Sequence, residues 1–372
     1  MSENTKQIKL LDKYILSQVV GATFGCILLF IVIWIAPETL LKVIKRTLSG
    51  DYTLSLAGQI LLLEIPKILN KALPVGLLLG ALFTFDKLSK DSEITVMRSF
   101  GISFSRIIAP VVVFSLFITV GCFVVYDKLI PMSVKQNNII RKENPSSHFV
   151  YTFKYDTGAP KKIMIVSNFD KKKIEKLVVL NFTNDQYSDA DILSSILMSE
   201  NAIYEDEVWT LPVAKKYTLS KEGIFELTST VDDVEIVSGQ KAKDVHTLMT
   251  YSVKRERELT NNELFDYIKL LKKENLMDEY SYMLNKFLQR YFHSIMCILF
   301  AALGCILGFS QPREQRLIGF TIAIGIVFSY YITLPFFDLL AEKRVMSPYL
   351  TSIIQPLAVL VLTWILKKMK DI

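Results

Sequence analysis

Six long apolar runs constrain the fold of this chain more than any other feature of its sequence. A helix needs about 20 residues to cross about 30 Å of hydrocarbon. Five of the runs reach this length without any Asp, Glu, Lys or Arg, namely residues 14–37, 107–126, 291–310, 317–337 and 346–366. We therefore predict an α-helical membrane protein with six transmembrane helices, three toward each end of the chain.

The sixth run, residues 60–85, differs because it carries Glu64, Lys67 and Lys71. At helical spacing these side chains share one face, where Glu64 and Lys67 can form an ion pair. Charges facing lipid are costly, so one interpretation is that protein or water covers this face. Alternatively, the lipid-buried part begins after Lys71, and the two lysines extend toward the membrane surface.

The lysines and arginines of the short loops predict the orientation, because such residues are more frequent on the cytoplasmic side. One side of the spans carries Lys6, Lys9, Lys13, Lys87, Lys90, Arg98, Arg106, Arg313, Arg316, Lys367, Lys368 and Lys370. The other side carries Lys42, Lys45, Arg46, Lys343 and Arg344. We therefore expect both termini to be cytoplasmic. The first run is too long, and too free of a small-residue cleavage site, to be a removed signal peptide.

The chain between the third and fourth spans is polar and has the pattern of β-strands. β-Branched or aromatic runs alternate with Asp, Asn, Gly and Lys turns at residues 161–169, 175–182, 206–219, 223–230 and 232–239. We expect an all-β sandwich or partly open roll on the outer side of the membrane. A helical stretch at residues 258–286, with Leu264, Ile268 and Leu271 on one face, then leads back into the membrane.

The sequence gives little support for an enzyme. It contains no Gly-x-x-x-x-Gly-Lys-Ser/Thr phosphate loop, so any ATP must be hydrolysed by another subunit. Its three histidines, His148, His246 and His293, are too scattered for a zinc site, and we interpret His293 as a packed or hydrogen-bonded residue of a span. We expect no metal, no cofactor and no nucleic-acid partner. The four cysteines, Cys26, Cys122, Cys297 and Cys305, fall within spans, so the outer domain must be stabilised by its own core.

A short charged stretch between the second and third spans predicts a helix of about two turns over residues 92–100. Asp91 or Ser92 suits the N-cap, and Gly101 suits the position after the C-cap. Glu93 falls in the first turn, where the helix dipole favours a negative charge. Ile94, Met97 and Phe100 recur at three-residue spacing and are expected to form an apolar face, with Glu93 and Arg98 as flanking charges. So short a helix is unstable alone. It must therefore dock on a partner or lie on the membrane surface.

Pairs of glycines at four-residue spacing indicate close helix packing within the spans. We favour packing within the chain over a subunit interface for these pairs, which are Gly21 and Gly25, Gly76 and Gly80, and Gly304 and Gly308.

The loop LSKDSEITVMRSFGISFSRIIAP (88–110) resembles that of the lipopolysaccharide export permeases LptF and LptG. Further segments are similar to this family in order and spacing: LLDKYILSQ (10–18), NAIYEDEVWTL (201–211), CILFAALGCILGFSQPREQR (297–316) and GFTIAIGIVFSYY (319–331). The resemblance covers nearly the whole chain. It implies one permease half of an ATP-binding-cassette exporter, paired with a second permease subunit in a hetero- or homodimer and bound to a separate LptB-like ATPase dimer. The loop helix would be the coupling helix, in which Glu93, Met97, Arg98 and Gly101 meet the ATPase.

The resemblance also implies the domain order and the location. Residues 1–130 would form spans one to three with the coupling helix near 92–100, residues 131–256 a periplasmic β-jellyroll-like domain, residues 257–286 a helical connector and residues 287–372 spans four to six. The protein would lie in the bacterial inner membrane. Its β domain would pass lipopolysaccharide to LptC-like and LptA-like periplasmic bridge proteins, and the first and fifth spans would form the gate for the lipid.

We therefore interpret the protein as a non-enzymatic transport permease that extracts lipopolysaccharide, or a related anionic glycolipid, from the outer leaflet. The lipid-binding candidates are Lys42, Lys45, Arg46, Lys67 and Lys71. For Lys42, Lys45 and Arg46 two interpretations stay open: they contact lipid phosphates, or they serve as ordinary interfacial anchors. Two alternatives stay open: a membrane-anchored protein that binds or senses an envelope ligand, and an exporter of the same build for another lipid or a lipoprotein.

Overall fold

The computed structural model describes the chain except residues 1, 36–38, 142–148, 155–159, 171–172, 185–190, 220–223, 253, 310–316 and 371–372. The chain forms two units, which we describe separately. The first comprises Met1–Lys142, Glu256–Ile268 and Asn275–Ile372, and the second comprises Glu143–Arg255 and Lys269–Glu274.

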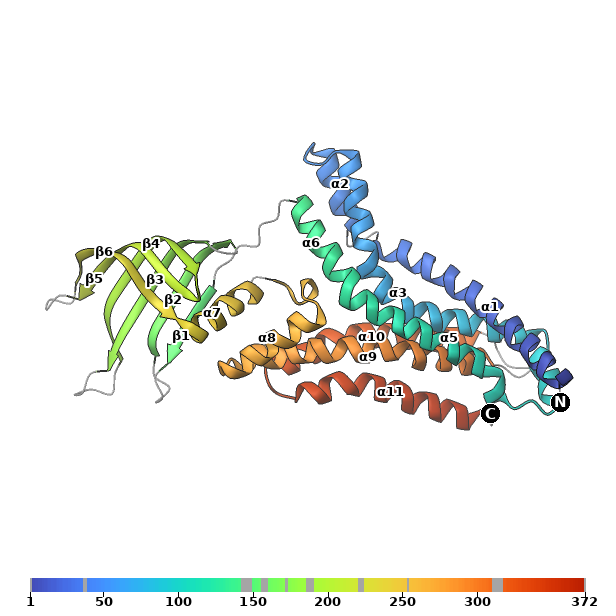
Figure 1. Ribbon diagram of the computed structural model, residues 1–372. Coiled ribbons are helices and arrows are strands. Elements are labelled where there is room, and N and C mark those ends of the chain that lie inside the picture. Colours follow the sequence, from blue (N-terminus) through green and yellow to red (C-terminus); the bar gives the residue numbers. More distant parts are fainter. Residues whose placement is uncertain are drawn as a thin grey trace. The chain divides into compact units, whose positions relative to one another are not determined.

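Six long apolar helices dominate the first unit (Figure 1). They include α1 (Ser2–Ile35), α3 (Leu54–Lys90), α5 (Phe104–Val124), α9 (Met277–Gly308), α10 (Leu317–Glu342) and α11 (Pro348–Met369). The third of them, α5, continues through the π-helical turn η2 (Val125–Leu129) into α6 (Ile130–Arg141). All six are long and apolar enough to cross a membrane, so the predicted six-span architecture is confirmed.

The helices α3 and α9 lie at the centre of this unit. In their most apolar windows 78% and 67% of the residues are buried, against 17–28% in the other four spans. Apolar side chains of α1 and α5 pack against this pair in one cluster, and those of α10 and α11 pack against it in another. The outward faces of the four peripheral helices are apolar, as expected for helices that contact lipid.

Glycines allow α3 to approach its two neighbours closely. A Cβ added at Gly304 of α9 would lie 2.3 Å from the backbone oxygen of Leu78, and one at Gly80 would lie 2.3 Å from Thr23 of α1. The second members of these pairs, Gly308 and Gly76, are equally crowded. Packing within the chain is therefore confirmed for two of the three glycine pairs. The third pair, Gly21 and Gly25, has nothing within 4 Å of the added Cβ.

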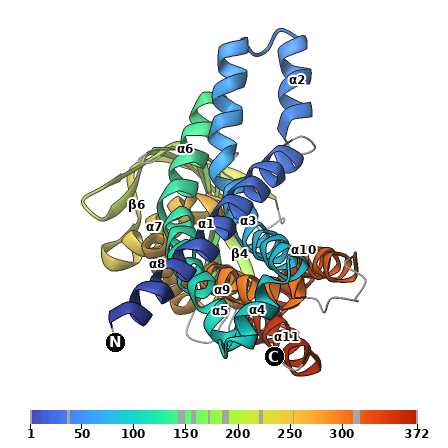
Figure 2. The ribbon, with the colours of Figure 1, turned by 90° about the vertical axis from the view of Figure 1, so that its right-hand side faces the viewer.

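Short helices occupy both ends of the bundle. A helical hairpin is formed by α2 (Leu41–Leu48) and the start of α3, and Ile140 of α6 packs against its apolar cluster (Figure 2). The loop between α3 and α5 contains α4 (Glu93–Ser99). The 3₁₀ turn η3 (Glu256–Glu258) precedes α8 (Asn261–Lys273), whose start is fixed by a capping box: Thr260 N donates to Glu263 Oε2 at 2.8 Å and Glu263 N donates to Thr260 Oγ1 at 3.3 Å.

The second unit contains one antiparallel six-stranded sheet in which the strands follow one another in sequence order. The strands are β1 (Phe149–Lys154), β2 (Pro160–Asp170), β3 (Lys173–Asn184), β4 (Asp191–Glu205), β5 (Val208–Leu219) and β6 (Phe225–Ser238). The inserted β domain is thus confirmed. Most of the two predicted runs at residues 223–230 and 232–239 lies in the single strand β6, and the prediction did not include β1 and β4.

A helix that the sequence did not reveal, α7 (Gly239–Ser252), packs on this sheet. The His246 ring stacks on Tyr204 of β4, with centroids 4.2 Å apart, and lies 5.6 Å from Trp209 of β5. Burial lowers the pKa of His246, so the ring is neutral at neutral pH and packs as an apolar group. The domain is therefore held by an aromatic and aliphatic core, as its lack of cysteines predicts.

Candidate functional site

The geometry at the ends of α4 explains where this helix begins and ends. Ser92 has a positive φ of 59° and makes no side-chain cap hydrogen bond, so the predicted side-chain N-cap is wrong. The C-terminal prediction holds, because Gly101 has a φ of +83°, which strains any residue with a Cβ. Gly101 N donates to Arg98 O at 2.9 Å and Ile102 N donates to Met97 O at 3.2 Å, the two bonds of a Schellman motif.

The two sides of α4 have different environments. Ile94 and Met97 are buried in the main apolar cluster, together with Phe104 of α5. Phe100 is 82% exposed and Val96 is 52% exposed, so the prediction that Phe100 shares the face of Ile94 and Met97 is wrong. The chain itself therefore covers one side of α4 and leaves an apolar second side exposed.

Polar and cationic contacts connect α4 to other helices at the same end of the bundle. Tyr14 of α1 donates a hydrogen bond from its hydroxyl to Glu93 Oε1 at 2.9 Å. The Arg98 guanidinium lies 5.7 Å from the centroid of the Phe309 ring. Two residues before Tyr14 along the chain, Asp12 forms a 2.7 Å ion pair with Arg106 of α5. Glu93 is thus in contact with the first span, a neighbour that sequence analysis did not identify.

The basic residues of α2 lie on an amphipathic helix. Lys42, Lys45 and Arg46 are exposed, and so are the apolar residues Leu41, Ile44 and Leu48, at 57%, 44% and 84%. Val43 alone is buried in this helix, where it packs with Ala57 and Ile60 of α3. Cations beside an exposed apolar stripe are typical of a helix at a membrane interface.

The charges within α3 have protein partners. Lys67 Nζ lies 3.3 Å from Glu64 Oε2, so the predicted ion pair is confirmed. Glu64 also accepts a hydrogen bond from Asn137 of α6 at 3.0 Å and lies 3.5 Å from Arg141 of that helix. The prediction that protein covers this part of the face is therefore confirmed for Glu64. Lys71 is further along α3, with its Nζ 4.6 Å from the centroid of the Trp34 ring.

Lys71 and Trp34 line a pocket of about 270 Å³ within the first unit. Its other charged lining residues are Arg257 of η3, Lys286 of α9 and Asp338 of α10. His293 also lines it and is hydrogen-bonded to Tyr330 and to the backbone oxygen of Asn70, at 2.7 and 3.1 Å, as its interpretation as a hydrogen-bonded residue predicts. The residues that line the pocket come from α1, α3, η2, η3, α9, α10 and α11.

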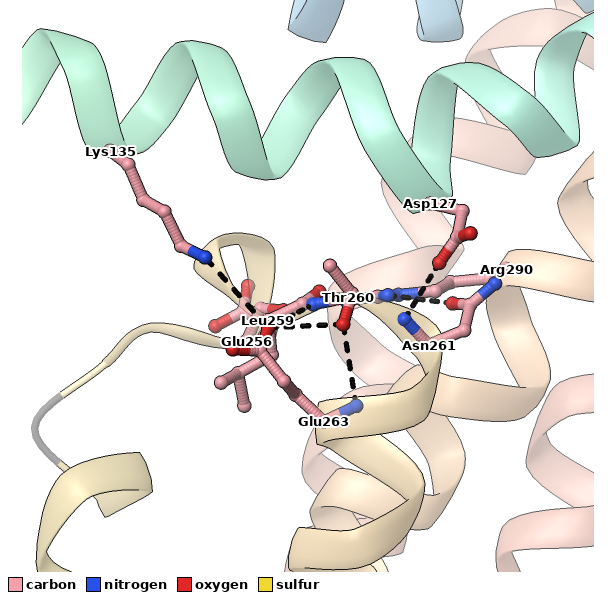
Figure 3. Close-up of polar contacts among 8 residues, drawn as sticks. All are labelled: Asp127, Lys135, Glu256, Leu259, Thr260, Asn261, Glu263 and Arg290. Atoms are coloured by element: carbon pink, nitrogen blue, oxygen red, sulfur yellow. Dashed lines mark hydrogen bonds and ion pairs between the residues drawn. The ribbon is translucent and has the colours of Figure 1, made fainter.

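A buried arginine fixes η3 against α9, as Figure 3 shows. Arg290 Nη2 donates to the backbone oxygens of Glu256 and Leu259, at 2.5 and 3.0 Å, and Nη1 donates to Asn261 Oδ1 at 2.7 Å. Asn261 N in turn donates to Asp127 Oδ1 of η2 at 2.8 Å. Charge-assisted hydrogen bonds of this kind are strong and directional. The turn that carries Arg257 is therefore positioned by α9, by the start of α8 and by η2.

Sequence analysis missed most residues of the pocket. The sequence contained only a weak signal for these residues. Asp338 directly follows one uncharged apolar run, and Lys286 precedes another by five residues. Charges at those positions are also what ordinary helix ends contain. Only the packing of α1, α3, η2, η3, α9, α10 and α11 brings the lining residues together.

Six membrane-crossing helices, interrupted after the third by a β-sheet unit and bearing a short helix between the second and third, define a multi-pass membrane protein with an inserted domain. Residues 13–368 match the family of lipopolysaccharide export system permeases LptF/LptG, and the chain belongs to this family of inner-membrane transport permeases. The similarity to the LptF protein of Escherichia coli (strain K12) is 26% identity over 105 residues, and that to LptF of Shigella flexneri is the same. The aligned part covers 28% of this chain and 28% of each relative.

Proposed function

We propose that this chain is a permease subunit of an ATP-binding-cassette exporter that extracts lipopolysaccharide, or a related anionic glycolipid, from the outer leaflet of the inner membrane. Membership of the LptF/LptG family supports this function. In this proposal a separate LptB-like ATPase dimer hydrolyses ATP, a second permease subunit of the same family completes the pore, and periplasmic LptC-like and LptA-like proteins receive the lipid.

The observation that carries the proposal is the division of α4 into a buried side and an exposed side. Ile94 and Met97 anchor the helix to α3 and α5, so α4 cannot move independently of the spans. Val96 and Phe100 face away from the chain's own core, and Arg98 is exposed with its guanidinium beside the Phe309 ring. A helix that is rigidly mounted on the membrane helices and exposes an aromatic residue is suited to receive a partner. The proposed ATPase contacts are Glu93, Arg98, Phe100 and Gly101, with Met97 as an internal anchor.

The proposed lipid contacts lie at the other end of the spans. Lys42, Lys45 and Arg46 on α2 would attract lipid phosphates while the exposed leucines and Ile44 enter the interface. Lys71 would act within the pocket beside Trp34. Lys67 is engaged by Glu64, so its role in lipid binding would be secondary.

Purification of the chain from its native membrane tests the function as a whole. We expect an ATPase with a phosphate-loop motif and an anionic glycolipid to copurify with it, and both should be identifiable by mass spectrometry. A copurified ATPase with a different lipid would indicate an exporter of another substrate. A chain that copurifies without any ATPase would contradict the transport function and favour an envelope sensor.

Labelling from outside the cell tests the proposed orientation, with both termini cytoplasmic and the β domain in the periplasm. A membrane-impermeant maleimide should label Lys215→Cys on β5, where the native side chain is exposed, and should spare Lys90→Cys next to α4. Both positions are exposed in the folded chain, so access depends on the side of the membrane. The parent chain, with its four cysteines in the spans, gives the background. The reverse labelling pattern would overturn the orientation and the direction of export.

A further inference from the structure

We propose that the pocket between α1, α3, η2, η3, α9, α10 and α11 binds a phosphate-sized anion, and that the bound anion replaces Asp338 as the partner of Lys286. The identity of the anion's carrier rests on the proposed function, whereas the site itself does not. A phosphate group could belong to the exported glycolipid or to an anionic phospholipid of the surrounding membrane.

The charge of the lining favours an anion. Three cationic side chains, Lys71, Arg257 and Lys286, line the pocket together with one carboxylate, Asp338. The three cations come from three different elements, so they converge on the pocket only in the folded unit. A volume of about 270 Å³ is also much larger than the roughly 10–15 Å³ that a single water molecule needs.

An unpartnered donor in the pocket lining points to an acceptor that the described part of the chain does not supply. The indole Nε1 of Trp34 is buried, and no described residue accepts its hydrogen bond. An indole N–H can only donate, and burying a polar group without a partner is costly. Lys71 Nζ lies over the same ring at 4.6 Å. A phosphate oxygen would supply an acceptor for the indole, next to the positive charge of Lys71.

The contacts of Asp338 allow Lys286 to change partner. Asp338 forms an ion pair with Lys286, and both side chains are 18% exposed. It also accepts hydrogen bonds from Asn285 Nδ2 at 2.9 Å and Gln289 Nε2 at 2.8 Å. If Lys286 turned toward an anion, Asp338 would keep two amide donors and would not become a buried carboxylate without partners. The carboxylate therefore competes with the anion for Lys286.

The third cation is already in position. Arg290 holds the backbone at Glu256 of η3 and at Leu259 directly after it (Figure 3), so the backbone of Arg257 needs little ordering when an anion binds. The Arg257 side chain is 48% exposed, with its Nε 3.5 Å from Glu256 Oε1. A preorganised backbone with a partly exposed guanidinium lowers the entropic cost of binding.

Equilibrium binding of inorganic pyrophosphate to the full chain in a neutral detergent tests the site. We expect Lys286→Gln and Arg257→Gln each to weaken binding about tenfold, because each removes one charge-assisted contact. Asp338→Asn should have the opposite effect and tighten binding severalfold, because the competitor for Lys286 loses its charge. The matched control is Lys343→Gln, an exposed lysine just beyond the end of α10 that does not line the pocket, and it should bind as the parent does.

Each outcome decides one part of the proposal. Parent-like affinity of both Lys286→Gln and Arg257→Gln, or no saturable binding by the parent, would overturn the anion site. Weaker binding by Asp338→Asn would overturn the partner exchange. Thermal unfolding without pyrophosphate identifies a variant that is simply misfolded.

Two further measurements identify the carrier of the phosphate. The chain is reconstituted in phosphatidylcholine nanodiscs that contain either phosphatidylglycerol or lipopolysaccharide, and lipid retention is compared between the parent and Lys286→Gln. A loss confined to lipopolysaccharide would make the pocket part of the substrate path, and a loss confined to phosphatidylglycerol would make it a site for bulk lipid. Since neither these measurements nor the pyrophosphate titration needs an ATPase, failure of the export function would not be confused with failure of the site.

Discussion

Replacing Phe100 by Asp should reduce retention of the ATPase by the solubilised permease about 30-fold or more, and export of lipid should fall with it. Phe100 is 82% exposed on α4, and buried aromatic anchors of an interface typically contribute about 2 kcal/mol or more. The side chain is not part of the chain's own core, so the variant should insert into the membrane and unfold at the same temperature as the parent. Copurification of the ATPase and lipid export measure the effect.

Two other substitutions act as controls for this experiment. Lys90→Gln changes an exposed residue at the end of α3 and should leave ATPase retention unchanged. Met97→Asp places a charge in the apolar cluster and should destabilise the chain itself. If Phe100→Asp retains the ATPase as well as Lys90→Gln does, α4 is a membrane-surface helix and not a docking element.

The same assay separates two roles of Glu93. Glu93→Arg should weaken ATPase binding by about 2 to 5 kcal/mol if the carboxylate meets a cation of the ATPase. Tyr14→Phe removes the hydrogen bond to Glu93 within the chain and leaves the carboxylate available to a partner. A loss of export in Tyr14→Phe with normal ATPase retention would show that Glu93 transmits the position of α4 to the first span.

Replacing Gly304 by Ala should strongly reduce the amount of folded protein, although Ala is the better helix former by about 1 kcal/mol. The new Cβ would lie 2.3 Å from the backbone oxygen of Leu78, so α3 and α9 would have to separate. Because these two helices form the centre of the first unit, the packing of all six spans would change. Overpacking typically costs about 1 to 3 kcal/mol, and a backbone atom cannot move aside as a side chain can.

The matched substitution is Gly25→Ala on α1, where nothing lies within 4 Å of the added Cβ. We expect this variant to be at least as stable as the parent chain. Membrane yield and thermal unfolding compare the two variants. Equal stability of Gly304→Ala and Gly25→Ala would contradict the close approach of α3 and α9.

Features that depend on short stretches of sequence could be predicted. The six spans follow from uninterrupted apolar length, and the turn after α4 follows from a glycine where only a positive φ fits. The Glu64 and Lys67 pair follows from helical spacing alone. Each of these predictions needs no knowledge of what lies beside the segment.

The apolar face of α4 could not be predicted by three-residue spacing. At 3.6 residues per turn, six positions advance about 600°, so Phe100 is rotated about 120° from Ile94 around the helix. The pocket was even harder to predict from the sequence, because it depends on which spans are neighbours in the folded bundle. Trp34, Arg257 and Asp338 are far apart in sequence, and none of them is distinctive in its own segment.

The continuous helix formed by α5, η2 and α6 has a mechanical consequence. It runs for 38 residues from Phe104 to Arg141, which corresponds to about 57 Å at 1.5 Å per residue. It begins three residues after Gly101, and the chain enters the second unit directly after it ends. About a pivot at Asp127 the helix has arms of about 35 and 21 Å, so each degree of tilt moves its start by about 0.6 Å and its end by about 0.4 Å. The π-helical turn at Val125–Leu129, where Asp127 is bonded to Asn261, is placed to act as its fulcrum.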